Sequence, residues 1–156
     1  MAKEIERKFI VTSDAWRYEA DEGTLLLQGY VAAQSSNSVR VRIRGDGQAS
    51  FTVKMGTGLV RDEFEYPVPI GDARRMLRGC VGNVIDKSRH LVRRGAFVWE
   101  VDVYNGALDG LVVAEVELNN EDDDPPLPAW AGREITDDPA YSNASLALKG
   151  LPENAA

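Results

Sequence analysis

Charged side chains recur at every second position in several short segments of the sequence. The first is "EIERK", which places Glu4, Glu6 and Lys8 two residues apart. In an extended strand alternate side chains share one face, so two carboxylates and an ammonium would point the same way. Like charges at this spacing repel each other unless opposite charge lies between them. A face of this kind is therefore either open to solvent or built to hold a ligand.

The same alternation returns along the chain, and the charges separate by sign. The cationic candidates are Lys8, Arg40, Arg42, Lys54, Lys87 and Arg89. The anionic candidates are Glu4, Glu6, Glu63, Glu65, Glu100, Asp102, Glu115 and Glu117. Carboxylate oxygens are ligands that Mg²⁺ and Mn²⁺ prefer, and arginine matches phosphate oxygens bidentately. A metal-bound chain of phosphates would satisfy both sets. For any single segment, an ordinary solvent-exposed face remains the alternative.

The elements that must position these side chains are mostly strands, because most segments alternate with period two between turn-forming residues. The expected strands are residues 3–11, 24–32, 38–45, 48–55, 60–68, 84–94, 96–104 and 111–119. A short helical turn at 13–17, a helix at 72–79, a solvated loop at 121–128 and a helix from Asp138 to Gly150 complete the pattern. This predicts a mainly β (α+β) fold: a single domain over residues 1–156 with an eight-stranded, closed antiparallel barrel and a few short helices.

A barrel with charged faces inside has a polar, hydrated lumen and apolar faces outside. Those outer faces need cover, since an exposed apolar exterior promotes aggregation. The short helices, the 121–128 loop and a second copy of the chain in a homodimer could supply it.

Composition narrows the class of protein. The 156 residues are 44% apolar and 28% charged, as in an ordinary globular protein. The net charge of −7 argues against nucleic-acid or anionic-membrane binding. No long apolar run suggests a membrane span, the first residues lack the apolar core of a signal peptide, and the single Cys80 fits a reducing compartment. We therefore expect a cytoplasmic protein.

The ordered charge pairs resemble the CYTH superfamily, also called triphosphate tunnel metalloenzymes. The E-x-E-x-K signature matches Glu4, Glu6 and Lys8. The later matches are "RVR" at 40–42, Lys54, "EFE" at 63–65, "KSR" at 87–89, "EVD" at 100–102, "EVE" at 115–117 and the closing "EITDDPAYSNASLA". The resemblance covers nearly the whole chain. It implies an eight-stranded tunnel that binds triphosphate compounds together with a divalent metal.

The resemblance also implies roles. Arg40, Arg42, Lys54, Lys87 and Arg89 would hold the triphosphate, and Lys8 would contact phosphate or position water. Glu4, Glu6, Asp102, Glu115 and Glu117 would hold Mg²⁺ or Mn²⁺, while Glu63, Glu65 and Glu100 would bind a second metal or orient the cations. Tyr30 is expected to face the lumen, where it could form an acid–base or positioning dyad with Lys8, although a tyrosine at a strand end is more often packing.

Among the family's reactions, hydrolysis of inorganic triphosphate is the leading hypothesis. The chain is compact and shows no added domain for a nucleoside or another organic group. The chemistry would be in-line attack of water on a terminal phosphoryl group, with metal, arginine and lysine neutralising the developing charge. Three alternatives stay open: a class IV adenylate cyclase, a thiamine or nucleoside triphosphatase, and a non-catalytic polyphosphate-binding module. The number of metals is also open.

Overall fold

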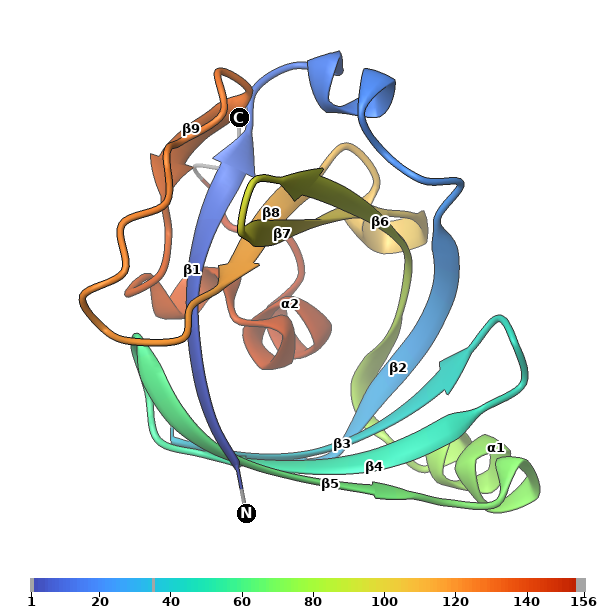
Figure 1. Cartoon of the computed structure of the whole chain (residues 1–156). Coiled ribbons are helices and arrows are strands. Elements are labelled where there is room, and N and C mark those ends of the chain that lie inside the picture. Colours follow the sequence, from blue (N-terminus) through green and yellow to red (C-terminus); the bar gives the residue numbers. More distant parts are fainter. Residues whose placement is uncertain (1, 35, 154–156) are drawn as a thin grey trace.

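The computed structural model describes residues 2–34 and 36–153. Its strands form one antiparallel sheet in the order β5-β4-β3-β2-β6-β7-β8-β1-β9. Strand β5 also pairs with β1, so the first eight strands close into a barrel and β9 lies on an outer edge (Figure 1). The predicted eight-stranded antiparallel barrel is confirmed.

The element bounds lie close to those expected from the alternation. The barrel strands are β1 (Ala2–Val11), β2 (Thr24–Ala33), β3 (Asn37–Arg44), β4 (Ala49–Met55), β5 (Val60–Pro67), β6 (Val81–Arg94), β7 (Phe97–Tyr104) and β8 (Val112–Glu117). The remaining elements are β9 (Ala131–Glu134), the helices α1 (Ile70–Arg78) and α2 (Asn143–Lys149), and the 3-10 turns η1 (Ala15–Tyr18), η2 (Gly106–Leu108) and η3 (Pro139–Tyr141). In the part of the chain that the structure describes, no helix is both long enough and apolar enough to cross a membrane.

Two segments differ from expectation. Strand β9 was not predicted, because "AGRE" has no apolar alternation and becomes a strand by pairing with the end of β1. The single helix expected from Asp138 is two elements. The Asp138 carboxylate accepts the Ala140 N–H and caps η3, whereas the Ser142 hydroxyl accepts the Ser145 N–H and caps α2. The extended backbone of Ser142 separates them.

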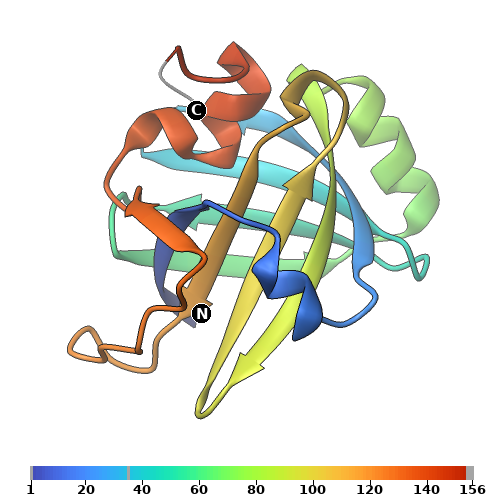
Figure 2. The same ribbon diagram turned by 90° about the horizontal axis from the view of Figure 1, so that it is seen from above.

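The chain itself covers part of the apolar outer face of the barrel. Val41 of β3 lies under Ala73 of α1. On the far side, Trp99 of β7 packs against Phe9 and Trp130, with ring centroids 5.6 and 5.7 Å apart. Figure 2 shows α1, η1 and the segment leading into β9 arranged around the outside of the sheet. Helix α1, η1 and the loop thus supply part of the cover, while Leu25, Met55 and Val84 remain exposed on the barrel strands.

The inside of the barrel is not polar throughout, which corrects the expectation of a wholly hydrated lumen. At one end, Tyr30, Ile85 and Tyr104 pack against Leu146 and Ala147 of α2. In Figure 1 α2 lies within the ring of strands. Ile85 lies two residues before Lys87 on β6, and Tyr104 lies two residues after Asp102 on β7. The alternation that points Lys87 and Asp102 inward therefore points Ile85 and Tyr104 inward too. The interior therefore has an apolar half and a charged half.

Candidate active site

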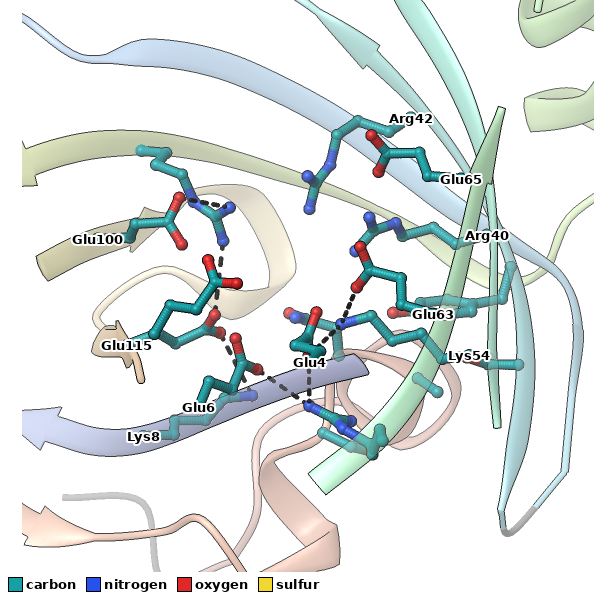
Figure 3. Close-up of a pocket in the computed structure, with 18 of the residues that line it drawn as sticks. Glu4, Glu6, Lys8, Arg40, Arg42, Lys54, Glu63, Glu65, Glu100 and Glu115 are labelled. Carbon is teal, nitrogen blue, oxygen red and sulfur yellow. Dashed lines mark hydrogen bonds and ion pairs between the residues drawn. The ribbon is translucent and has the colours of Figure 1, made fainter. Parts of the chain in front are cut away.

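The charged half encloses a cavity of about 240 Å³ (Figure 3). Among the described residues, seven cationic and seven anionic side chains line it. The cations are Lys3, Lys8, Arg40, Arg42, Lys54, Arg61 and Arg89, and the anions are Glu4, Glu6, Glu63, Glu65, Glu100, Glu115 and Glu117. Tyr30 also lines the cavity. The structure thus brings together every residue proposed from the sequence except Lys87 and Asp102.

Strand order places the opposite charges on facing walls. Arg40, Arg42 and Lys54 come from β3 and β4, whereas Glu6 and Glu115 come from β1 and β8. The β3–β4 pair and the β8–β1 pair lie on different sides of the ring, and Figure 3 shows the two groups pointing toward each other across the cavity. A ligand that carries both metal and phosphate charge can span this space.

The basic wall has more positive charge than its surroundings neutralise. Arg42 Nε donates to Gln28 Oε1 at 2.8 Å, and Arg40 Nη2 donates to Thr52 Oγ1 at 3.4 Å. Within residues 2–34 and 36–153, no carboxylate forms an ion pair with either guanidinium, and the buried Nε of Arg40 has no hydrogen-bond partner. Burial and the nearby Arg40 and Arg89 lower the pKa of Arg42 to about 9. Among the described residues, these two guanidinium groups are therefore available to bind an anion.

The carboxylates of the acidic wall differ in their pKa shifts. Burial, together with Glu115 and Glu4, raises the pKa of Glu6 to about 8. Burial acts on Glu115 in the same sense, but Lys8 and Arg89 outweigh it and hold the Glu115 pKa well below its ordinary value. The ammonium of Lys8 lies 3.6 Å from Glu115. The two neighbouring carboxylates thus differ in pKa because nearby cations dominate at Glu115, whereas burial dominates at Glu6.

Arg61 is a lining residue that the sequence reasoning missed. Its Nη2 donates to Glu4 Oε1 at 3.2 Å and to Glu6 Oε1 at 3.0 Å. Lys54 Nζ donates to the same Glu4 oxygen at 3.0 Å. The signal was present, because Arg61 shares the strand face of Glu63 and Glu65. Arg61 was not predicted because the sequence pattern grouped residues of like charge, and Arg61 is a cation next to two carboxylates.

Lys87 and Asp102 lie behind the cavity wall. Lys87 Nζ is 2.6 Å from Asp102 Oδ2, and both side chains are fully buried. Arg89 holds the same carboxylate with two bonds of 2.8 and 2.9 Å. Burial raises the pKa of Asp102, but Arg89 and Lys87 outweigh it and lower that pKa. The carboxylate thus contacts two cations and fixes the direction of Arg89, and neither Lys87 nor Asp102 is among the described lining residues. The metal contact expected of Asp102 and the phosphate contact expected of Lys87 stay predictions.

Lys8 and His90 have contacts of their own. Lys8 Nζ donates to the Tyr141 carbonyl at 3.3 Å, and among the described residues no hydrogen bond joins it to the Tyr30 hydroxyl. His90 lies on the strand face opposite to that of Arg89. Its ring packs on Trp16 at 5.0 Å, and its Nδ1 lies 3.2 Å from the Asp21 carbonyl, outside the cavity.

The donor set fits a hard divalent cation. The residues facing the acidic wall offer carboxylate oxygens, which Mg²⁺ and Mn²⁺ prefer over nitrogen or sulfur. No group of three or more His, Cys, Asp or Glu residues in the described part of the chain is already gathered in metal-binding geometry. Glu4 and Glu6 instead hold protein cations. The chemistry of the side chains suits a metal, whereas their present contacts are ion pairs.

Comparison with known proteins identifies the family. The model of the CYTH domain matches residues 2–150. The chain belongs to the CYTH family. An inorganic triphosphatase of Acetivibrio thermocellus is 45% identical over 148 residues, which is 94% of each chain. An inorganic triphosphatase of Nitrosomonas europaea is 33% identical over 153 residues, covering 93% of this CYTH protein and 97% of the relative.

Solved structures agree with the fold. The crystal structure of an inorganic triphosphatase superposes with a TM-score of 0.67 at 30% identity, covering 97% of this CYTH chain and 99% of the other. A putative adenylyl cyclase from Hippeastrum has a TM-score of 0.61 at 14% identity, over 75% of this chain and 80% of that one. At that low identity the second likeness shows a shared fold alone.

Proposed function

We propose that this CYTH protein is a metal-dependent inorganic triphosphatase that hydrolyses tripolyphosphate to pyrophosphate and phosphate. The observation that carries the proposal is the pair of arginines, buried Arg40 and half-buried Arg42, which have no carboxylate partner among the described residues and face a wall of carboxylates. Two relatives that span almost the whole chain are named inorganic triphosphatases. The arginines match phosphate oxygens, and the carboxylates match a divalent metal.

Cationic side chains would hold the substrate. Arg40 and Arg42 offer guanidinium groups that match phosphate oxygens. Arg89 adds a third guanidinium, whose direction is fixed by its two bonds to Asp102. Lys54 and Lys8 lie nearer the carboxylates and would contact the phosphates closest to the metal. Together these groups would neutralise charge that develops as the phosphoryl group is transferred.

Carboxylates would hold Mg²⁺ or Mn²⁺, with Glu4, Glu6, Glu115 and Glu117 as the candidate ligands. When bound, such an ion supplies Lewis-acid stabilisation of the phosphoryl oxygens. The Thr52 hydroxyl lies 3.4 Å from Arg40 and donates to Glu65 at 3.2 Å, so Glu65 orients the basic wall. Glu63 lies 3.6 Å from Lys54, and Glu100 lies 3.2 Å from Arg89. These three carboxylates would act by aiming cations.

The lining favours an inorganic chain over a nucleotide. At about 240 Å³ the cavity is smaller than the roughly 300–1,000 Å³ usual for organic ligands. Tyr30 is the one aromatic side chain among the lining residues that the structure describes. Trp16, Trp99 and Trp130 are buried in the outer apolar cluster, where they cannot stack on a base. A linear triphosphate needs only the charged walls.

One assay separates the candidate reactions. The protein is incubated with Mg²⁺ or Mn²⁺ and, separately, tripolyphosphate, ATP or thiamine triphosphate, and phosphate, pyrophosphate and cyclic AMP are measured. We expect tripolyphosphate to be hydrolysed fastest. Cyclic AMP from ATP would instead support a cyclase, faster hydrolysis of ATP or thiamine triphosphate an organic triphosphatase, and tight binding without turnover a binding module.

A matched pair of variants tests the site on one strand. Arg40 faces the cavity, whereas Arg44 of the same strand is exposed and lies 3.6 Å from Asp46. We expect Arg40→Gln to lower kcat/KM about 100-fold, in line with the loss of a donor to transition-state charge. Arg44→Gln should stay within about twofold of the parent. Equal rates for both variants would contradict the placement of substrate.

A further inference from the structure

Arg61 bridges the two carboxylates of the first strand. It lies on β5 directly opposite Glu4 of β1 in the strand register. A single guanidinium nitrogen of Arg61 is 3.2 Å from Glu4 Oε1 and 3.0 Å from Glu6 Oε1. Two carboxylates on one strand face repel each other, and a cation between them removes that repulsion.

We propose that Arg61 is a stand-in for the divalent metal: it occupies the position between Glu4 and Glu6 in the metal-free protein and is displaced when the ion binds. The inference rests on the proposed function for its assignment of Glu4 and Glu6 as metal ligands. A divalent ion bound to these oxygens would lie about 2 Å from them. The guanidinium that now contacts both oxygens would then repel the ion at close range.

The contacts distinguish Arg61 from the other nearby cation. Lys54 Nζ contacts Glu4 at 3.0 Å and Glu63 at 3.6 Å. Among the residues that the structure describes, Arg61 is the cation that joins Glu4 to Glu6 through ion pairs. The Arg61 side chain is 22% exposed, more than those of Glu4 and Glu6 at 14% and 12%. It therefore borders open space into which it can withdraw while the carboxylates stay in place.

This arrangement makes metal binding a competition inside the protein. The pair of carboxylates is preorganised without metal, but the ion must displace a bound charge. If Arg61 occupies the site in most molecules, only the remaining fraction can bind metal. The apparent metal affinity is then the intrinsic affinity multiplied by that fraction. Removing the guanidinium should therefore increase the affinity for metal and lower the stability of the folded protein in the absence of metal.

The test is a calorimetric titration of Mn²⁺ into phosphate-free protein, comparing the parent with Arg61→Gln, Arg61→Lys and the exposed control Arg44→Gln. We expect Arg61→Gln to bind Mn²⁺ about tenfold more tightly, with Arg61→Lys between it and the parent and Arg44→Gln unchanged. In chelator, Arg61→Gln should unfold at a lower temperature than the parent, and Mn²⁺ should raise its unfolding temperature by more.

Three results would overturn the inference: equal or weaker Mn²⁺ binding by Arg61→Gln, a reversed order for Arg61→Lys, or no Mn²⁺ binding by any variant. If Arg61→Gln does not fold in chelator, the Mn²⁺ affinities of Arg61→Lys and the parent are compared, and tighter binding by Arg61→Lys is the expected result. The titration contains no triphosphate and measures no turnover. If the parent hydrolyses no tripolyphosphate but Arg61→Gln binds Mn²⁺ more tightly, this inference stands and the proposed function is wrong. If the parent is active but Arg61→Gln binds Mn²⁺ no more tightly, the proposed function stands and this inference is wrong.

Discussion

The two halves of the barrel interior are built from the same strands and serve different ends. In the charged half, Arg89 and Glu100 border a cavity, and Arg40 and Arg42 have no carboxylate partner within the described chain. In the apolar half, Ile85 and Tyr104 pack closely against Leu146 of α2. Strands β6 and β7 cross from one half to the other within a few residues. Inward orientation therefore decides that a side chain meets the lumen, while its chemistry decides whether it packs or binds.

The Lys87–Asp102 pair marks the boundary between the halves. Lys87 Nζ lies 5.3 Å from the centroid of the Tyr104 ring, on the apolar side, while Asp102 holds Arg89 on the charged side. The pair is fully buried, so its charges are balanced within the protein instead of by water. It gives Arg89 a fixed direction at the edge of the cavity.

The largest expected effect is a loss of activity from a change confined to the charged half. The double variant Glu4→Gln and Glu6→Gln keeps side-chain size but removes two candidate metal ligands. We expect kcat/KM for tripolyphosphate with Mg²⁺ to fall about a thousandfold, equivalent to about 4 kcal/mol of transition-state stabilisation. Circular dichroism should show the parent fold. A rate near that of the parent would remove Glu4 and Glu6 from the metal site.

Removing charge at the boundary should affect both halves. Asp102→Asn leaves the Arg89 guanidinium and the buried Lys87 beside a neutral amide, and losing one partner of a buried pair costs about 3–5 kcal/mol. Chemical denaturation measures the free energy of unfolding, and kcat/KM should fall because Arg89 loses its bidentate partner. The exposed Asp109→Asn is the control, expected within about 0.5 kcal/mol. A similarly small change for Asp102→Asn would show that the boundary pair is not needed.

The apolar half should respond through stability. Leu146 is 1% exposed and Leu148 of the same helix is 45% exposed. Leu146→Ala should lower the free energy of unfolding by about 2–4 kcal/mol, whereas Leu148→Ala should cost less than about 1 kcal/mol. Well below the unfolding temperature, we expect kcat to stay within about threefold for both. A large loss of kcat in folded Leu146→Ala would show that packing in the apolar half also affects catalysis in the charged half.

The charged half should also give the metal-free protein an unusual pH dependence. The pKa of Glu6 is about 8 in the folded protein, against an ordinary value of 4.5. Between these values the folded protein keeps a proton that the unfolded chain has lost, so stability present at low pH is lost as pH rises toward 8. In chelator, the free energy of unfolding should fall by at most about 1.4 kcal/mol per pH unit. Glu6→Gln should flatten this slope, and an unchanged slope would assign it to another group.

The smallest effect is expected at Tyr30, which belongs to both halves. Its ring packs in the apolar cluster, and the residue also lines the cavity. Because Lys8 donates to the Tyr141 carbonyl, Tyr30→Phe should leave kcat within about threefold. A loss of about 100-fold, with a changed pH profile, would restore the Lys8–Tyr30 acid–base dyad expected from the sequence.

The alternation of charge predicted the barrel because it is a local property of each strand. Val41 and Arg42 had to face opposite sides, and the structure buries Val41 under α1 while Arg42 lines the cavity. Strand β9 escaped because its four residues carry no such pattern and depend on pairing with β1. The break at Ser142 escaped because a hydroxyl cap competes with the carboxylate cap at Asp138.

The charged residues were predicted more completely than their partners. Alternation says that Lys87, Asp102 and Arg61 point inward, but it does not say how far along the barrel each lies. Asp102 meets two cations and leaves the cavity wall, while Arg61 meets two carboxylates and joins it. Such pairing depends on which strands become neighbours, and that information is not local to any segment.

The ring of strands is completed over a short stretch. In the described part of the chain, β1 joins β5 through the register from Ala2 to Ile5, whereas the junction of β2 and β3 runs from Leu26 to Ala33. Short junctions with few hydrogen bonds are where a sheet parts most readily. Glu4 and Arg61 face each other across this one. Their ion pair therefore spans the junction that completes the barrel, and a metal ion that takes Glu4 from Arg61 also changes the contact between the first and fifth strands.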